Sequence, residues 1–159
     1  MGKILTIACT LLILGLPQLG LTQLDRPAIT SFTQQNQAQP VPLPLEQAFP
    51  YFVSELSPGK YRVTWNLAAG HYLYRHAFQF TLRQSESGDS ISVDYVLPDG
   101  IQKTDQFFGQ IEAYYNLVNV DLELTTVPGP DAELVIQYQG CADWGFCYPP
   151  QRSPFKLQP

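Results

Sequence analysis

Hydrophobic and polar residues alternate along several short segments of the chain. In residues 60–67 and again in residues 117–124, apolar side chains fall at every second position, with charged or polar side chains between them. A period of two residues places alternate side chains on opposite faces of a β-strand. Residues 72–82, 91–97 and 134–138 show a similar alternation of apolar and polar residues. The pattern therefore predicts a series of strands, each with one buried face.

Turn signals separate the predicted strands. Residues 69–70, 98–100 and 128–130 combine Gly, Pro, Ala and Asp, most of which favour tight turns. Sustained helical periodicity and internal repeats are both absent from the sequence. Short strands between evenly spaced turns predict an all-β fold, specifically an immunoglobulin-like antiparallel β-sandwich.

Trp65 and the cysteines indicate which kind of sandwich this is. In a true immunoglobulin domain, a tryptophan packs against a disulfide that joins the two sheets. Cys141 and Cys147 lie in one local segment, so they cannot form such a link. We therefore expect Trp65 to be an ordinary core residue.

The beginning of the chain has the pattern of an export signal. A lysine precedes an apolar run over residues 4–16, and small residues lead up to Thr22. We expect residues 1–22 to be a signal peptide cleaved after Thr22, because the run is too short for a comfortable membrane span. Residues 23–44, rich in Gln, Pro, Ser and Thr, are expected to form an extended leader or linker. Residues 45–159 are then one periplasmic domain, and the mature chain has no membrane span.

Charge and composition disfavour several classes of function. The formal net charge is −5, which disfavours nucleic acid and anionic membranes as partners. His71 and His76 lie five residues apart on one predicted strand, hence on opposite faces, and Met1 is the only methionine. We therefore expect no metal and no other cofactor. A hydrolase finds no support, since the sequence has no nucleophile elbow and no clustered His and acid pair.

Residues 140–150, Gly-Cys-Ala-Asp-Trp-Gly-Phe-Cys-Tyr-Pro-Pro, contain two of the three cysteines, while Cys9 lies in the predicted signal peptide. To join the two sulfurs the chain must double back between Cys141 and Cys147, which Gly145 and the following prolines favour. In the chain-entropy model so short a loop contributes about 2.4 kcal/mol, against about 4.7 kcal/mol for a loop of around 100 residues. This weak stabilisation favours a redox-active bond. A static disulfide in an exported domain is the alternative.

The cysteine segment lacks an obvious activating group. No Lys, Arg or His lies between the cysteines, and the Asp143 carboxylate would repel a neighbouring thiolate. We therefore expect a partner protein to supply much of the activation, unless a group from elsewhere in the fold does so.

Residues 138–150 resemble the active-site motif of the amino-terminal periplasmic domain of the thiol:disulfide interchange protein DsbD. Three further segments match in order. Residues 45–49 resemble the start of that domain, residues 70–75 resemble its Gly-Tyr-Tyr-Leu-Tyr-Arg strand, and residues 105–109 resemble its cap loop. The resemblance extends over residues 42–157, and four ordered motifs make it specific.

The resemblance implies an immunoglobulin-like sandwich that relays electrons as a component of a protein-disulfide reductase. Such a domain accepts reducing equivalents from a thioredoxin-like domain or membrane electron donor. It passes them to periplasmic thioredoxin-fold acceptors, such as disulfide isomerases and proteins of cytochrome c maturation. By position, Cys147 matches the cysteine that forms mixed disulfides, and Cys141 matches its resolving mate. Phe107 matches the aromatic tip that covers the pair, while Tyr72 and Tyr74 match tyrosines that line the site.

Further candidate site residues come from the cap loop and the cysteine segment: Asp105, Phe108, Asp143, Trp144 and Phe146. Trp144 stands where the family has a small residue, and it either enlarges an apolar patch for a partner or covers the site. Without the resemblance, Phe107 and Phe108 would be interpreted as core residues.

Other positions also depart from the family pattern. Gln106 replaces an acidic residue, while Phe108 and His71 replace tyrosines, so any acid–base or hydroxyl role at Gln106 and Phe108 is in question. The usual protein of this family continues into a membrane domain, whereas this sequence ends at Pro159, so we expect the electron donor to act in trans. The alternative function is that of an immunoglobulin-like binding adaptor with a static disulfide. A relay exchanges its disulfide rapidly and reversibly, whereas an adaptor keeps it buried and resistant.

Overall fold

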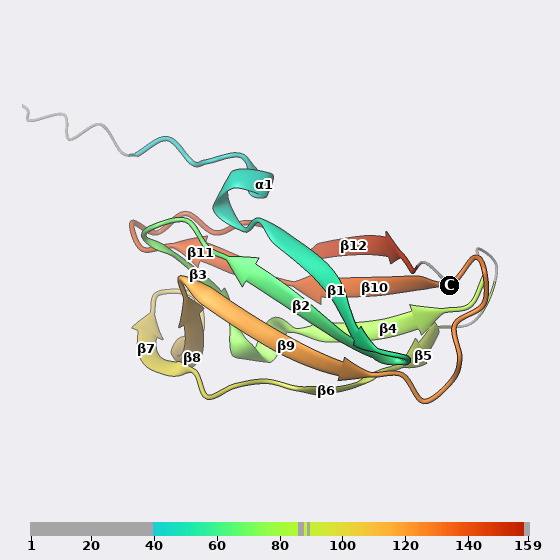
Figure 1. The fold of residues 1–159 in the computed structure, drawn as a ribbon. Coiled ribbons are helices and arrows are strands. Elements are labelled where there is room, and N and C mark those ends of the chain that lie inside the picture. The colour runs from blue at the N-terminus through green and yellow to red at the C-terminus, as the bar shows by residue number, and fades with distance from the viewer. Residues whose placement is uncertain (1–39, 86–87, 89, 158–159) are drawn as a thin grey trace, which may run out of the picture. The chain divides into compact units, whose positions relative to one another are not determined.

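The structure is a computed structural model that describes residues 40–85, 88 and 90–157. The predicted signal peptide and most of the predicted linker lie outside these residues. The elements, shown in Figure 1, are α1 (Leu45–Ala48), β1 (Tyr51–Ser57), β2 (Lys60–Asn66), β3 (His71–Tyr74), the 3₁₀ turn η1 (Arg75–Ala77), β4 (Gln79–Arg83), β5 (Ser90–Ser92), β6 (Asp94–Val96), β7 (Ile101–Asp105), β8 (Gly109–Tyr115), β9 (Leu117–Glu123), β10 (Glu133–Tyr138), β11 (Gly140–Ala142) and β12 (Gln151–Lys156).

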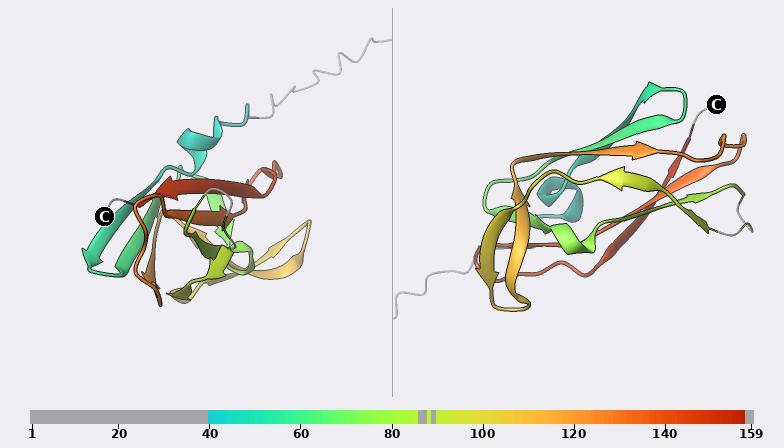
Figure 2. Two further views of the ribbon diagram at one scale, coloured as in Figure 1. Left: turned by 90° about the vertical axis from the view of Figure 1, so that its right-hand side faces the viewer. Right: turned by 90° about the horizontal axis from the view of Figure 1, so that it is seen from below.

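The strands pair into three antiparallel sheets. The first has the order β1-β2-β9-β6, the second β12-β10-β4-β5 and the third β11-β3-β8-β7. The first two sheets form the two layers of a sandwich, and the third lies at one end of it (Figures 1 and 2). The predicted all-β class and antiparallel sandwich are therefore confirmed.

The core between the two layers is aromatic. Trp65 is fully buried, and its ring lies 5.2 Å from that of Phe78 and 5.6 Å from that of Tyr138, measured between centroids. These rings come from both layers and meet mostly edge to face, the arrangement that aromatic quadrupoles favour. The prediction that Trp65 is a core residue is confirmed.

The two clearest alternating patterns form adjacent strands of the first layer. β2 pairs with β9 from Lys60 opposite Glu123 to Asn66 opposite Leu117. Along β9, each second residue is buried and the residues between are exposed. The pattern predicts both strands because each has one face on the core and one in solvent.

Two predicted segments are interrupted, and in both the chain passes between sheets. Residues 72–82 are divided by η1, which carries the chain from β3 in the third sheet to β4 in the second. Residues 91–97 are divided at Val93, where the chain leaves β5, paired with β4, and enters β6, paired with β9. Val93 itself is apolar and buried, so the alternation of apolar and polar residues in the sequence continues through the break and conceals it.

The short helix α1 precedes β1, and the residue after it packs against the third sheet. Phe49, which follows α1, is buried, and its ring packs edge to face on the rings of His71 and Tyr148. Within the described residues, no helix combines the length and hydropathy needed to cross a membrane.

Candidate redox site

The cysteine pair lies where β11 ends and the chain turns back. Cys141 and Cys147 are joined by a disulfide, with their Cα atoms 4.0 Å apart. The amide of Ala142 donates to the carbonyl of Phe146 at 2.7 Å, and the amide of Gly145 donates to the carbonyl of Ala142 at 2.9 Å. Gly145 has a φ of +94°, a conformation that favours glycine. The predicted turn and cysteine pairing are both present.

The two cysteines differ in exposure. Cys141 is fully buried, whereas Cys147 is only partly buried. Gly140 explains part of this difference, since a Cβ at this position would collide with the Tyr72 carbonyl and the Phe49 ring. β11 therefore packs closely against β3, with Cys141 opposite Tyr72. Cys147 is therefore the more exposed of the two bonded residues.

Two tyrosines on β3 connect the sulfurs to an acidic side chain. Tyr72 and Tyr74 are two residues apart and share one face of the strand, with ring centroids 5.4 Å apart. The Tyr74 hydroxyl lies 2.9 Å from Sγ of Cys141 and 3.6 Å from Sγ of Cys147. It donates a hydrogen bond to Asp105, as does Tyr72 at 3.2 Å. Burial raises the pKa of both hydroxyls, so both remain protonated donors.

Asp105 also fixes the shape of the cap loop. It ends β7 and pairs with Gly109, the first residue of β8, so residues 105–109 form the turn of a hairpin. One Asp105 oxygen accepts hydrogen bonds from the amides of Phe107 at 3.0 Å and Phe108 at 2.7 Å. Burial alone would raise the pKa of this carboxyl, but hydrogen bonds from Tyr74, these two amides and Tyr72 lower it. The same carboxylate thus fixes the turn and contacts the tyrosine beside the sulfurs.

The two phenylalanines of the cap do not belong to the core. Phe107 is 50% exposed and Phe108 is 52% exposed. Phe108 packs edge to face on Tyr74, at 5.0 Å between centroids, while Phe107 lines a cavity of about 260 Å³ beside the cysteine loop. The alternative interpretation of these residues as core is wrong, because the hairpin turn projects beyond the sheet layers.

A lysine from β7 lies beside the cysteine loop, which sequence reasoning missed. Lys103 Nζ lies 3.0 Å from Asp143 Oδ1 and 4.7 Å from the centroid of the Tyr72 ring. The Tyr115 hydroxyl donates to the same Asp143 oxygen at 2.7 Å. Hydrogen bonds with Tyr115 and Asp143 raise the pKa of Lys103 despite its partial burial. Asp143 is therefore paired. The local sequence carries no signal for this contact, because it depends on the order of strands in the third sheet.

The cap and the cysteine loop are also joined directly. The Gln106 side-chain amide donates to the Gly145 carbonyl at 3.2 Å. A carboxylate has no hydrogen to donate, so an acidic side chain at position 106 could not make this bond.

Two departures from the family pattern contact each other. The rings of His71 and Trp144 are perpendicular, with centroids 5.0 Å apart. His71 is buried, and its Nδ1 lies 3.1 Å from the carbonyl of Ala69 while its Nε2 lies 3.4 Å from the hydroxyl of Tyr148. His71 thus packs against Trp144 and holds its ring in place. Neither interpretation of Trp144 from the sequence included this contact.

The structure changes one premise about the histidines. His71 lies on β3, but His76 lies in η1, with its ring 5.1 Å from that of Phe108. The prediction that both lie on one strand is wrong, because the strand ends at Tyr74. Within the described part of the chain, no group of three or more His, Cys, Asp or Glu residues could hold a metal ion.

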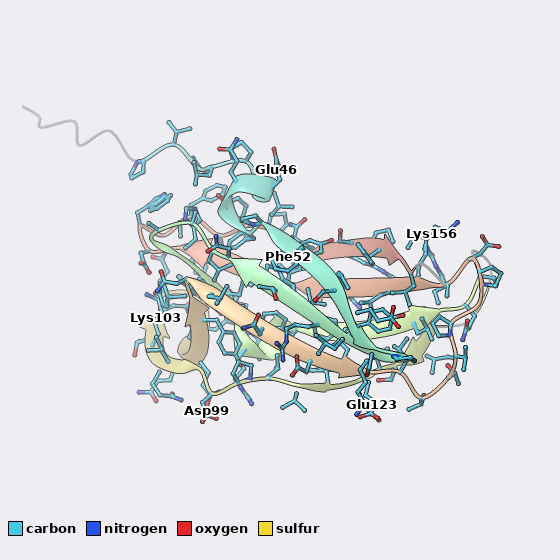
Figure 3. The ribbon with its side chains drawn as sticks, in the orientation of Figure 1. Glu46, Phe52, Asp99, Lys103, Glu123 and Lys156 are labelled. Carbon is cyan, nitrogen blue, oxygen red and sulfur yellow. A yellow bond between two sulfur atoms is a disulfide. The ribbon has the colours of Figure 1, made fainter. Side chains whose placement is uncertain are left out.

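Phe146 completes the set of candidate residues. It is 38% exposed, and its ring packs edge to face on that of Tyr148 at 4.9 Å. The structure therefore brings the cysteine pair, the two tyrosines, the cap loop and the aromatic cysteine loop together at one end of the sandwich. Lys103, labelled in Figure 3, marks this end, and Glu123 and Lys156 lie toward the opposite end.

Solved structures of similar fold come from Neisseria meningitidis. The reduced DsbD N-terminal domain superposes with a TM-score of 0.63 at 28% identity, covering 74% of this chain and 90% of that domain. The complex between the DsbD N-terminal and PilB N-terminal domains gives a TM-score of 0.58 at 27% identity, covering 72% and 85%. The immunoglobulin-like type of the sandwich is thereby confirmed.

Two similar proteins carry the name thiol:disulfide interchange protein DsbD. DsbD 1 of Pseudomonas aeruginosa is 38% identical over 116 residues, which are 72% of this chain and 19% of that protein. DsbD 2 of the same organism is 35% identical over 147 residues, which are 92% of this chain and 23% of that protein. This chain thus spans about a fifth of the length of these relatives. The family model for the N-terminal part of the thiol:disulfide interchange protein DsbD matches residues 39–159. With the disulfide, the cap and the sandwich in agreement, the chain belongs to the family of DsbD N-terminal domains.

Proposed function

We propose that this domain is a periplasmic thiol:disulfide exchange module. It passes reducing equivalents through Cys141 and Cys147 from a thioredoxin-like donor to the disulfides of other proteins. The observation that carries the proposal is the unequal protection of the two bonded cysteines, since Cys141 is fully buried and Cys147 is partly exposed. Such asymmetry suits exchange between proteins, because the mixed disulfide then forms at one defined sulfur.

Reduction of the domain begins when a donor thiolate attacks Sγ of Cys147. The donor sulfur bonds to Cys147, the bond between the two cysteines breaks, and its electron pair leaves on Sγ of Cys141. A second donor thiolate then attacks the donor's own sulfur in the mixed disulfide and releases Cys147. The donor dithiol becomes a disulfide and this domain becomes a dithiol, with two electrons and two protons transferred. Transfer to a target disulfide follows the same steps in reverse, with Cys141 as the resolving thiol.

The Tyr74 hydroxyl is placed to assist the departure of Cys141. It lies 2.9 Å from Sγ of Cys141 and can donate its hydrogen to the thiolate as negative charge develops there. The Asp105 carboxylate accepts the same hydrogen in the disulfide form.

The cap loop controls access in this proposal. Phe108 packs on Tyr74, whose hydroxyl lies beside both sulfurs, and Gln106 joins the hairpin turn to the Gly145 carbonyl. A partner that reaches Cys147 has to displace the cap. The chain's own hydrogen bonds hold the cap closed, so a docked protein can open it more readily than a small reagent can.

The class of partner follows from the family. The N-terminal domain of PilB forms a complex with the DsbD N-terminal domain in Neisseria meningitidis, and this supports a thioredoxin-like partner for the present chain. Donor and acceptor are both of this class, and exchange takes place in the oxidising periplasm, where such disulfides persist.

Trapping experiments with single-cysteine variants test the direction of attack. Cys141→Ser leaves Cys147 without its resolving thiol, so a thioredoxin-like domain that retains one reactive cysteine becomes fixed on Cys147. Cys147→Ser leaves only the buried Cys141 and traps little. Non-reducing gels measure both products. Equal trapping would show that the order of the two sulfurs is wrong, and no trapping by either variant would favour an adaptor with a static disulfide.

A further inference from the structure

A proline-rich segment runs beside the cysteine loop. Residues 40–44, Pro-Val-Pro-Leu-Pro, precede α1, and we name them the strap. Between the strap and the loop lies a cavity of about 390 Å³, lined by Pro40, Val41, Pro42, Trp144, Gly145 and Phe146. None of these side chains is charged. We name this cavity the strap groove.

Both walls of the groove are held in place. The Tyr148 hydroxyl donates to the carbonyl of Leu43 in the strap at 2.8 Å, and the strap prolines restrict φ along it. On the other wall, Trp144 packs against the edge of His71 and over Gly70, where a Cβ would lie 3.6 Å from the indole ring. A groove with fixed walls loses little conformational entropy when it is filled.

The groove also presents apolar surface to solvent. Val41 is 84% exposed and Phe146 is 38% exposed. The cavity on the cap side of the loop differs, because the charged residues Lys103, Asp105 and Asp143 are part of its lining. Those charged groups already have hydrogen-bond partners within the domain. The strap side therefore offers the apolar contact that interface cores favour.

The position of the groove relative to Cys147 identifies what covers it. Trp144, Gly145 and Phe146 immediately precede Cys147 in the loop. A mixed disulfide brings the partner's sulfur to about 2.05 Å from Sγ of Cys147, so the partner's surface must extend over the neighbouring loop residues. Three residues of the strap groove thus belong to the loop that any partner bonded to Cys147 must contact.

We propose that the strap groove is the docking surface for the thioredoxin-like partner. An apolar side chain bordering the partner's reactive cysteine inserts between the strap and Trp144. This inference rests on the proposed function and deepens it. Trp144 is then a specificity-determining residue, since large aromatic side chains in fixed pockets carry much of the affinity in protein interfaces. His71 acts through Trp144 as a positioning residue.

The test compares a protein reductant with a small one. Reduction of the Cys141–Cys147 disulfide is followed by mass after alkylation, with the reduced N-terminal domain of PilB from Neisseria meningitidis or with dithiothreitol. The measured quantity is the rate with the PilB domain divided by the rate with dithiothreitol. Trp144→Ala is expected to lower this ratio about tenfold or more, as a lost interface anchor does. Val41→Asp is expected to lower it similarly, because it places a charge in an apolar contact.

Val127→Asp is the matched control. Val127 is 89% exposed and lines a cavity with Pro58 and Gly59 away from the cysteine loop. The substitution makes the same change of residue and charge as Val41→Asp. The ratio for this variant is expected to equal that of the parent. Val41 is so exposed that its substitution leaves the fold intact, which covers the case in which Trp144→Ala does not fold.

The outcomes separate this inference from the proposed function. If the parent is reduced by neither reagent at a measurable rate, the proposed function fails. If the parent is reduced by both reagents but Trp144→Ala and Val41→Asp keep the parental ratio, only the docking surface is overturned. A ratio lowered equally by Val127→Asp would also overturn it, because the effect would then be one of overall charge.

Discussion

The single hydrogen of the Tyr74 hydroxyl has competing acceptors. In the disulfide form it is donated to Asp105, while Sγ of Cys141 lies 2.9 Å from the same oxygen. When the disulfide opens, the Cys141 thiolate becomes a second charged acceptor for this hydrogen, because a thiolate accepts a hydrogen bond more strongly than a disulfide sulfur does. The Tyr74 hydroxyl thus links the cysteine pair to the carboxylate that accepts from the amides of Phe107 and Phe108.

Tyr74→Phe removes this hydrogen and keeps the ring. We expect reduction of the disulfide to slow by roughly tenfold or more, since a hydrogen bond to a charged group contributes about 1.5–3 kcal/mol. Rates with dithiothreitol at fixed pH measure the effect. Tyr114→Phe is the control, because it removes a hydroxyl that donates to the Pro98 carbonyl at 2.6 Å. Similar slowing in both variants would assign the effect to loss of packing or stability.

The Asp105 carboxyl makes stability depend on pH. Its pKa is lowered in the folded domain, so the ionised form stabilises the fold at pH values above the ordinary aspartate pKa of about 3.9. This contribution disappears as the pH falls through the lowered value. We expect the Tm of the parent to fall more between pH 7 and pH 3 than the Tm of Asp105→Asn. Asp131→Asn, at an exposed carboxyl paired with Lys156, serves as control. Equal decreases in the parent and Asp105→Asn would contradict the account.

Strand elements could be predicted where one strand stays in one sheet. β2 and β9 follow the alternation in their sequence over their full length, although Thr64 on the polar face of β2 is also buried. The interruption at Val93 could not be predicted, since apolar residues keep the same two-residue spacing in the sequence where the chain changes sheets. The interruption at η1 was likewise concealed by the aromatic residues on both sides of it. The contact of Lys103 with Asp143 was missed for a related reason, as it joins β7 to the cysteine loop across the third sheet.

In the proposed function, access to the sulfurs depends on the cap hairpin. Phe107 is half exposed, so Phe107→Ala should cost less than the roughly 3–5 kcal/mol typical of a buried phenylalanine. We expect the reduced cysteines of this variant to react faster with iodoacetamide, because the cap covers less of the site. Alkylation rates and denaturation midpoints at equal pH measure both effects. An unchanged rate together with a large loss of stability would show that Phe107 is a structural residue rather than a lid.

At the scale of the whole molecule, the core and the disulfide are separate. The main cluster of buried residues joins the first two sheets around Trp65, whereas Cys141 belongs to a smaller cluster with Tyr72, Tyr74 and Ile111. The structure brings the residues of the sequence motifs together at this end of the molecule, whereas the composition of their surroundings follows from strand order. Because the main core does not include the cysteines, redox change at one end can leave the sandwich intact.

Reduction should therefore preserve cooperative unfolding. We expect the dithiol form to be less stable than the disulfide form by about 2 kcal/mol, the scale for so short a loop. Thermal melts of both forms, with the thiols counted by mass, measure this difference. A reduced form that unfolds without cooperativity would show that the disulfide is a structural requirement of the fold, which a relay could not tolerate.

The reduction potential of the Cys141–Cys147 pair tests the central claim most directly. Equilibration of the domain with graded ratios of reduced and oxidised glutathione or dithiothreitol, followed by alkylation and mass measurement, gives this potential. The account predicts one reversible two-electron couple between about −270 and −120 mV, the range of thioredoxin-like proteins that exchange disulfides. A potential below about −300 mV, where structural disulfides of exported proteins lie, would contradict it.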